Sequence, residues 1–264
     1  MQQVVIVTGG SSGIGLATAR AFRAAGCMVY ELSRRDVVHQ DGIVHISGDV
    51  TDEKRVREAV EEVESAQGRV DILVCNAGFG ISGAAEFTEN QDAKQLLDVN
   101  LFGMVNAVKA VVPGMRRRRA GRILCISSIA AAVPIPFQAW YSVSKAAVSA
   151  YAGALRQELL PFGIQVCAIL PGDIHSGFTG HRVKSPVGDD IYGGRISRSV
   201  AVMEHDEQTG MSPEQAAKAI ACIAFKAHMK PSYAIGLPYK GVMVLLRILP
   251  GEWISRIVGH MYAR

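Results

Sequence analysis

Short runs of β-branched residues alternate with longer segments of helical period along most of this chain. The runs that favour strands are residues 4–7, 28–32, 43–47, 72–75, 123–127, 165–170 and 233–236. Between the first two runs, Ile14, Ala17 and Ala21 recur at helical spacing, and a glycine follows them. Strands that alternate with crossover helices form parallel sheets with helices on both faces. The sequence therefore predicts an α/β fold.

The composition is that of a globular chain with a sizeable core. Of the 264 residues, 49% are hydrophobic and 20% are charged. These values exclude a disordered or collagen-like chain. The length lies within the range of one large α/β domain, so residues 1–264 are expected to form a single domain. The net charge of +4 is small, and no nucleic-acid partner is expected.

The cysteines and the N-terminus predict a cytoplasmic protein. Five cysteines occur without a CxxC pair, and the first four lie in apolar, strand-like runs. Such residues are typical of reduced core thiols. The N-terminal apolar run is too short for a signal peptide and has no basic residues before it, so no export is expected.

A glycine-rich turn, Thr8-Gly-Gly-Ser-Ser-Gly-Ile-Gly15, follows the first strand and leads into a helix. Glycines there permit a tight turn and let a pyrophosphate approach the backbone amides at the positive end of the helix. An ordinary strand-to-helix turn remains the alternative. Other residues support the hypothesis that this turn binds a nucleotide. Polar or turn-forming residues also follow later strands: Asp49-Val50, Asn76-Ala77-Gly78, Ser127-Ser128 and Pro171-Gly172. In a parallel sheet these ends lie along one edge.

Tyr141 and Lys145 are four residues apart in a segment of helical composition, so they share one face of a helix. An isolated pair of this kind is usually solvated. Here the pair follows Ser128 by 13 residues. A phenol has a pKa of about 10, which is too high for efficient proton exchange near neutrality, and a nearby ammonium lowers that pKa. A catalytic tyrosine is therefore expected.

These motifs together resemble the short-chain dehydrogenase/reductase family, from Val4 to about Ser176. The resemblance rests on TGGSSGIG, NAG, the Asn in Asp98-Val-Asn100, Ser128, the YSVSK run ending at Lys145, and PG followed by Ser176. It implies a Rossmann-type, doubly wound three-layer sandwich with a seven-stranded parallel sheet. It also implies hydride transfer to or from a nicotinamide ring, between a carbonyl and an alcohol.

The resemblance assigns roles by position. Tyr141 is the general acid in reduction and the general base in oxidation, and Ser128 hydrogen-bonds the substrate oxygen. Lys145 holds the nicotinamide ribose and lowers the Tyr141 pKa, and Asn100 orders a water that links Lys145 to solvent. The expected cofactor contacts are Gly9, Ser11, Ser12, Gly13, Ile14, Gly15, Ser33, Arg34, Asp49, Val50, Asn76, Ala77, Gly78, Tyr141, Lys145, Pro171, Gly172, Ile174 and Ser176. Ser176 stands where the family usually has Thr. No metal is expected, because the histidines lack zinc-ligand spacing.

The second strand predicts which cofactor binds. At its end Ser33 and Arg34 stand where an acidic residue would hold the ribose 2′-hydroxyl of NAD(H). A guanidinium there suits the 2′-phosphate, so NADP(H) is favoured. NAD(H) is the alternative, because Glu31 or Asp36 would bind the ribose if the register slipped.

The substrate is expected to be hydrophobic and to bind under a substrate loop, about residues 173–210. Phe178 is expected to contact the substrate. Other apolar residues expected in this pocket are Val133, Ile135, Phe137, Trp140, Val183, Ile191, Tyr192, Ile196 and Met203. This set suggests a steroid-like, retinoid-like or lipidic carbonyl or alcohol, although core packing and subunit contacts would also use such residues.

The C-terminal stretch, about residues 237–264, is apolar in two pieces. It is expected to be a helical cover on the substrate side or a subunit contact, and an interfacial membrane contact is the alternative. The family resemblance implies a homo-oligomer, a dimer or a tetramer. Two other functions remain open: a 3-oxoacyl carrier-protein reductase and a non-catalytic nicotinamide-binding regulator.

Overall fold

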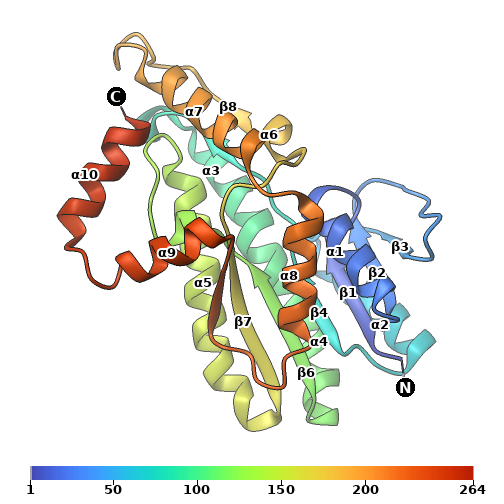
Figure 1. Ribbon diagram of the computed structural model, residues 1–264. Coiled ribbons are helices and arrows are strands. Elements are labelled where there is room, and N and C mark those ends of the chain that lie inside the picture. The colour runs from blue at the N-terminus through green and yellow to red at the C-terminus, as the bar shows by residue number, and fades with distance from the viewer. Residues whose placement is uncertain (1, 264) are drawn as a thin grey trace.

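The computed structural model describes residues 2–263 and has a seven-stranded, all-parallel sheet at its centre (Figure 1). The strand order is β3-β2-β1-β4-β6-β7-β9. The strands are β1 (Val4–Thr8), β2 (Met28–Ser33), β3 (Val44–Ser47), β4 (Ile72–Cys75), β6 (Gly121–Ile126), β7 (Ile164–Pro171) and β9 (Ser232–Ile235). All the predicted strands are present, and the Rossmann-type fold is confirmed. The order reverses between β1 and β4, the place where doubly wound sheets bind ligands.

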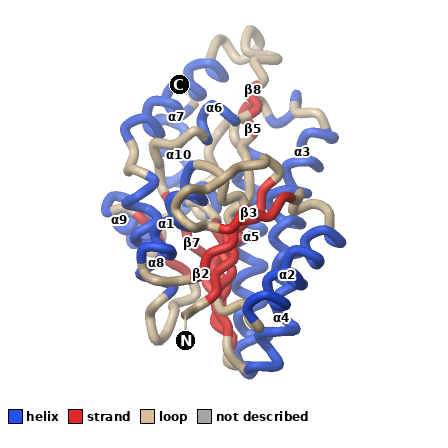
Figure 2. Tube along the Cα trace, turned by 90° about the vertical axis from the view of Figure 1, so that its right-hand side faces the viewer, coloured by secondary structure: helices blue, strands red, loops and turns tan. Residues whose placement is uncertain are grey.

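Helices cover both faces of the sheet. Figure 2 shows the sheet between α1 and α8 on one side and α2 and α4 on the other. These helices, with α5 beside α4, are α1 (Gly13–Ala24), α2 (Glu53–Gln67), α4 (Gly103–Arg118), α5 (Ala139–Leu159) and α8 (Pro213–Ala224). Within β1, Val5 and Val7 pack toward α1, whereas Val4 and Ile6 pack toward the other layer. The strand is therefore apolar at every position, which is why it appears as an uninterrupted run in the sequence.

Local sequence signals set several helix boundaries. The α2 helix ends at Gly68, whose φ of 76° is left-handed and suits a residue without a Cβ. The α8 helix begins after Ser212, which forms a capping box with Gln215, and Pro213 occupies the first turn. The predicted start at Ser212-Pro213 is confirmed.

One long helical run joins α3 (Asn90–Leu97) to α4 through a π-helical turn, Asp98–Phe102. By length and composition, residues 90–118 match a membrane-crossing helix. In this fold Met104, Val108 and Val111 of the run are buried in the core. The run is therefore a central packing element of the α/β layer. Shorter 3-10 turns are Ala85–Phe87, Ile129–Ala131 and Leu160–Phe162.

The segment expected to be a substrate loop, about residues 173–210, contains regular elements. It contains α6 (Phe178–His181), β8 (Val183–Lys184) and α7 (Arg195–Thr209). A second small sheet forms where β8 pairs in parallel with β5 (Ile81–Ser82). The α7 helix has no strong period in the sequence because it buries a narrow face made by Ile196, Ser199 and Met203. These regular elements within the expected substrate loop were not predicted from the sequence.

The last residues form two helices, α9 (Leu237–Leu245) and α10 (Gly251–Tyr262). Figure 1 shows them extending to one side of the sheet and returning toward α7. We call residues 237–263 the C-terminal arm. The Tyr262 hydroxyl donates to Asp206 of α7 at 3.0 Å, and Arg195 Nε donates to the Ala263 carbonyl at 2.6 Å. The arm is thus held at both ends, by the sheet and by α7.

Candidate active site

A cleft of 720 Å³ lies at the carboxyl ends of the strands and extends beneath the C-terminal arm. Every residue expected to contact the cofactor lines this cleft, and so do Ser128 and Phe178. The motifs that are far apart in the sequence therefore converge at one place. Asn100 differs from the other candidate catalytic residues, because it is 2% exposed and lies behind the cleft wall.

The glycine-rich turn packs against the residues that follow β4. A Cβ added at Gly15 would lie 2.1 Å from the Gly9 carbonyl oxygen, so only glycine fits there. Asn76 Nδ2 donates to the carbonyls of Thr8 and Gly9, both at 3.1 Å. The glycines let a ligand approach the backbone amides at the α1 N-terminus, so the turn fits a dinucleotide pyrophosphate.

Thr8 is a site residue that the sequence analysis did not single out. Its side chain is buried, and its Oγ1 accepts hydrogen bonds from the amides of Asn76 at 3.0 Å and Ala77 at 3.2 Å. Thr8 therefore fixes the spacing between the turns after β1 and β4. The sequence does place Thr8 at the end of a predicted strand. Its hydrogen-bond partners could not be predicted, because they depend on the pairing of β4 with β1.

Tyr141 points into the cleft from the first turn of α5. Its ring centroid lies 5.7 Å from that of Phe178, which places the expected substrate contact against the expected acid/base. Burial raises the Tyr141 pKa to about 12, and a hydrogen bond with Ser128 works in the opposite direction. Glu207 and Asp173 raise this pKa further by their negative charge. Tyr141 is therefore a protonated hydroxyl at neutral pH.

Lys145 is one turn further along α5 and is also buried. Its Nζ donates to the Ile126 carbonyl at 2.9 Å and lies 5.8 Å from the centroid of the Tyr141 ring. Burial lowers the Lys145 pKa to about 8. The expected lowering of the Tyr141 pKa by Lys145 stays a prediction; in this geometry the ammonium group is turned toward β6, and burial raises the Tyr141 pKa.

Asn100 and Ser127 hold the helix that carries Tyr141 and Lys145. The π-helical turn aims Asn100 inward, where its Oδ1 accepts from Phe79 N at 2.9 Å and its Nδ2 donates to Ser144 Oγ at 3.0 Å. π-Helical turns often occur at functional sites. Ser127, which was not assigned a role, donates from its Oγ to the Lys145 carbonyl at 2.8 Å. The water-ordering role of Asn100 stays a prediction.

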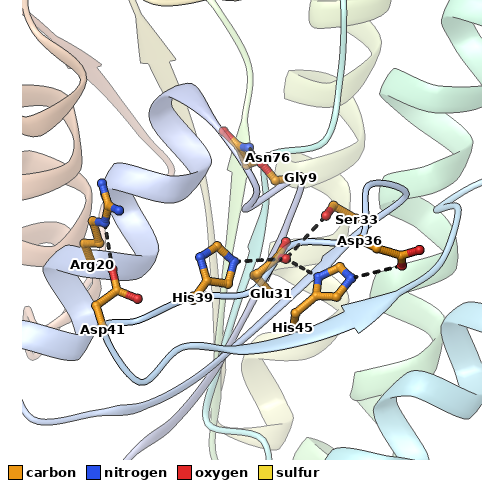
Figure 3. A network of polar contacts seen from close by, with 9 residues as sticks. All are labelled: Gly9, Arg20, Glu31, Ser33, Asp36, His39, Asp41, His45 and Asn76. Atoms are coloured by element: carbon orange, nitrogen blue, oxygen red, sulfur yellow. Dashed lines mark hydrogen bonds and ion pairs between the residues drawn. The ribbon is translucent and has the colours of Figure 1, made fainter.

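Glu31 belongs to a buried polar network beside the glycine-rich turn (Figure 3). It is fully buried and contacts the rings of His45 and His39, the latter at 3.3 Å. Ser33 Oγ also donates to Glu31 Oε1, at 3.3 Å. Because Glu31 is fully buried and does not line the cleft, it does not present its carboxylate to a ribose at the cleft surface. Asp36 lies outside the cleft lining and faces His45.

Two arginines stand over the nucleotide end of the cleft. Arg34 Nη1 lies 3.8 Å from Asp49 Oδ2, and its side chain is 72% exposed. Arg35 Nη2 donates to Ser12 Oγ of the glycine-rich turn at 3.0 Å. Together with Ser33, these groups supply positive charge and hydroxyls at the predicted cofactor-selecting position.

The apolar half of the cleft differs from the prediction. Val133, Ile135, Phe178 and Val183 line it, but the other expected residues do not. Ile196 and Met203 are buried under α7, Ile191 is exposed, and the ring of Tyr192 packs against that of Phe137. Trp140 also lies outside the cleft lining. The C-terminal arm takes their place, with Val242, Leu245, Leu246, Leu249, Ile254, Ile257, Val258, Met261 and Tyr262.

Known proteins share both the sequence pattern and this architecture. Residues 3–186 match the family model described as short chain dehydrogenase. A 3-ketodihydrosphingosine reductase of Bacteroides thetaiotaomicron is 40% identical over 223 residues, covering 84% of this chain and 83% of the relative. A short-chain dehydrogenase from Streptomyces avermitilis has a TM-score of 0.83 and 29% identity, covering 98% of both chains. A structure of ElxO with NADP bound has a TM-score of 0.75 and 25% identity, covering 91% of this chain and 100% of that chain. The chain therefore belongs to the short-chain dehydrogenase/reductase family and is an oxidoreductase that acts on hydroxyl or carbonyl groups.

Proposed function

We propose that this protein is an NADP(H)-dependent reductase of long-chain, lipidic ketones. One observation carries the proposal: a single cleft joins Ser128, Tyr141 and Lys145 to an apolar channel under the C-terminal arm. The polar end suits carbonyl chemistry, and the apolar end suits an alkyl chain. The similarity to a 3-ketodihydrosphingosine reductase supports the same substrate class.

The mechanism assigns a task to each polar group. The reduced nicotinamide supplies a hydride to the carbonyl carbon when it is bound. Ser128 and Tyr141 hydrogen-bond the carbonyl oxygen, and Tyr141 transfers its hydroxyl proton to that oxygen to give the alcohol. With its pKa raised to about 12, Tyr141 carries this proton at neutral pH. Lys145 holds the cofactor ribose and returns a proton to Tyr141.

The nucleotide end supports NADP(H). Ser12, Ser33, Arg34 and Arg35 surround the position expected for the 2′-phosphate, and guanidinium groups bind phosphate through charge-assisted hydrogen bonds. Glu31, the carboxylate that would favour NAD(H), is buried and does not line the cleft.

The exterior of the arm supports a peripheral membrane contact. Leu237, Ile248 and Trp253 are 82%, 72% and 62% exposed, and Arg247 and Arg256 lie on the same segment. Apolar and basic residues together favour the surface of an anionic bilayer, where a lipidic substrate resides. We also propose a cytoplasmic location and a homo-oligomer, as expected from the sequence.

Cofactor titration followed by a substrate panel tests this function. NADPH and NADH binding would be followed by nicotinamide fluorescence, and cofactor oxidation would be measured with lipidic, steroid and small polar carbonyls for wild type and Tyr141→Phe. We expect tight NADPH binding by both proteins, and turnover of lipidic ketones by wild type alone. Good turnover of small polar ketones with poor turnover of lipidic ones would contradict the proposal. Binding without turnover of any carbonyl would favour a regulator.

A further inference from the structure

A buried carboxylate lies beneath the nucleotide end of the cleft. Glu31 is in β2, between the buried Tyr30 and Leu32, and is paired in register with His45 of β3. A Cβ added at Gly10 would lie 2.5 Å from the Glu31 Cβ, so the glycine-rich turn packs directly against this side chain. Burying a charged group costs free energy unless partners compensate for the lost water. The proposed mechanism does not use Glu31.

One oxygen of Glu31 gathers partners that lie along the chain from the end of β2 to β3 (Figure 3). Ser33 Oγ donates to Glu31 Oε1 at 3.3 Å, and His39 Nε2 lies 3.3 Å from the same oxygen. His45 Nδ1 also contacts it, and the other ring nitrogen of His45 lies 3.8 Å from Asp36 Oδ1. Glu31 therefore holds Ser33, His39 and His45 directly and Asp36 through His45.

The segment that Glu31 holds carries the two arginines of the nucleotide end. Residues 34–43 form no helix or strand, so side-chain contacts have to fix the course of this segment. Arg34 and Arg35 stand between Ser33 and Asp36, and both of these flanking residues belong to the Glu31 network. A backbone that is fixed before binding reduces the entropy that exposed side chains lose when they bind a ligand. Glu31 thus sets the backbone from which both guanidinium groups extend.

We propose that Glu31 is a positioning residue for recognition of the 2′-phosphate of NADP(H). This inference rests on the proposed function, since it concerns the cofactor of that function. Glu31 does not line the cleft, so it acts through its three direct partners. These partners fix the segment that brings Arg34 and Arg35 over the nucleotide end of the cleft.

The charge of Glu31 would act in the opposite direction. A carboxylate repels a nearby phosphate group, so charge alone would make Glu31 unfavourable for NADP(H) binding. Removal of the carboxylate therefore separates the two effects. Loss of position weakens the binding of NADPH, whereas loss of repulsion strengthens it.

Two variants remove the contact from its two sides: Glu31→Leu and His39→Phe. NADPH and NADH differ only in the 2′-phosphate, so Kd for each, measured by nicotinamide fluorescence, isolates recognition of this group. In Glu31→Leu we expect Kd for NADPH to rise about 10- to 100-fold, the range for one lost charged hydrogen bond, and Kd for NADH to change little. His39→Phe should give a smaller rise in Kd for NADPH, because Ser33 and His45 still hold Glu31.

The conservative variant and the control come from the same segment. His39→Gln keeps an N–H donor for Glu31 and should retain most of the NADPH affinity that His39→Phe loses. Val38→Ala is the matched control, because the Val38 side chain is 96% exposed, and it should leave both Kd values unchanged. If Glu31→Leu does not fold, the comparison of His39→Phe with His39→Gln carries the test.

The outcomes separate the two proposals. If wild type binds NADPH no more tightly than NADH, the proposed cofactor choice fails, and this inference fails with it. If wild type prefers NADPH but Glu31→Leu and His39→Phe raise both Kd values equally, Glu31 serves only the stability of the fold and the inference is overturned. Tighter binding of NADPH by Glu31→Leu would also overturn it, because charge and not position would then be the effect of Glu31.

Discussion

The buried, charged Lys145 should lower the free energy of unfolding, so Lys145→Met should produce a more stable protein. Burial lowers the Lys145 pKa from its ordinary value of 10.5 to about 8. Between these values the unfolded chain binds a proton that the folded chain does not, so stability rises with pH across that window. Below pH 8 the whole cost is present, and it corresponds to about 3 kcal/mol at 1.36 kcal/mol per pKa unit.

Methionine has a similar shape to lysine and avoids the buried amine. It also loses the hydrogen bond to the Ile126 carbonyl, which costs about 1 kcal/mol. The net expectation at pH 7 is a gain of about 2 kcal/mol in the free energy of unfolding, with loss of reductase activity. At pH 9.5 the charge cost falls to about 1.4 kcal/mol, so the gain should nearly vanish.

Urea denaturation followed by circular dichroism at the two pH values measures this difference. Lys109→Met is the control, because the Lys109 side chain is 59% exposed and forms a surface ion pair with Glu53. This control should change the stability by less than about 0.5 kcal/mol at either pH. A Lys145→Met protein that is less stable than wild type at pH 7, or a gain that is the same at both pH values, would refute the reasoning.

Three further changes test separate parts of the cleft. Thr8→Val removes the acceptor for two backbone amides after β4 and should lower the free energy of unfolding by about 1–3 kcal/mol in urea denaturation, whereas Thr8→Ser should retain most of the stability. Gly172→Ala places a Cβ 1.9 Å from the Tyr239 ring and should accelerate hydrogen exchange in α9. Gly153→Ala, which meets nothing within 4 Å, should leave exchange in α9 unchanged, and equal effects would count against this packing. Arg34→Ala should raise KM for NADPH far more than for NADH in steady-state kinetics, and equal increases would reject the NADP(H) assignment.

The sheet and the nucleotide end of the cleft were predictable because their signals are local. Each buried strand is an apolar run, and each motif residue follows directly at its end, as with Asn76 after β4. In a parallel sheet, the chain direction alone brings these ends together. Thr8 shows the limit of this reasoning, because its role depends on hydrogen bonds from Asn76 and Ala77, which follow β4 and are far from Thr8 in the sequence.

The substrate end was less predictable because it depends on which way apolar side chains face. Ile196 and Met203 were expected in the pocket, but once residues 195–209 form a helix these side chains pack beneath it. Residues of the C-terminal arm, such as Leu246, line the cleft instead. Hydrophobicity predicted a helical cover there, while its position over the cleft depends on the contacts of Tyr239 and Tyr262, which no periodicity reveals.

Isotope transfer tests the central claim most directly. NADPH carrying deuterium in both positions at C4 would be incubated with a long-chain ketone and either wild type or Tyr141→Phe, and the alcohol would be examined by mass spectrometry. The account predicts an alcohol with deuterium on the former carbonyl carbon from wild type. It predicts no product from Tyr141→Phe, although the variant still binds NADPH. Alcohol without deuterium, or labelled alcohol formed by Tyr141→Phe at the wild-type rate, would contradict it.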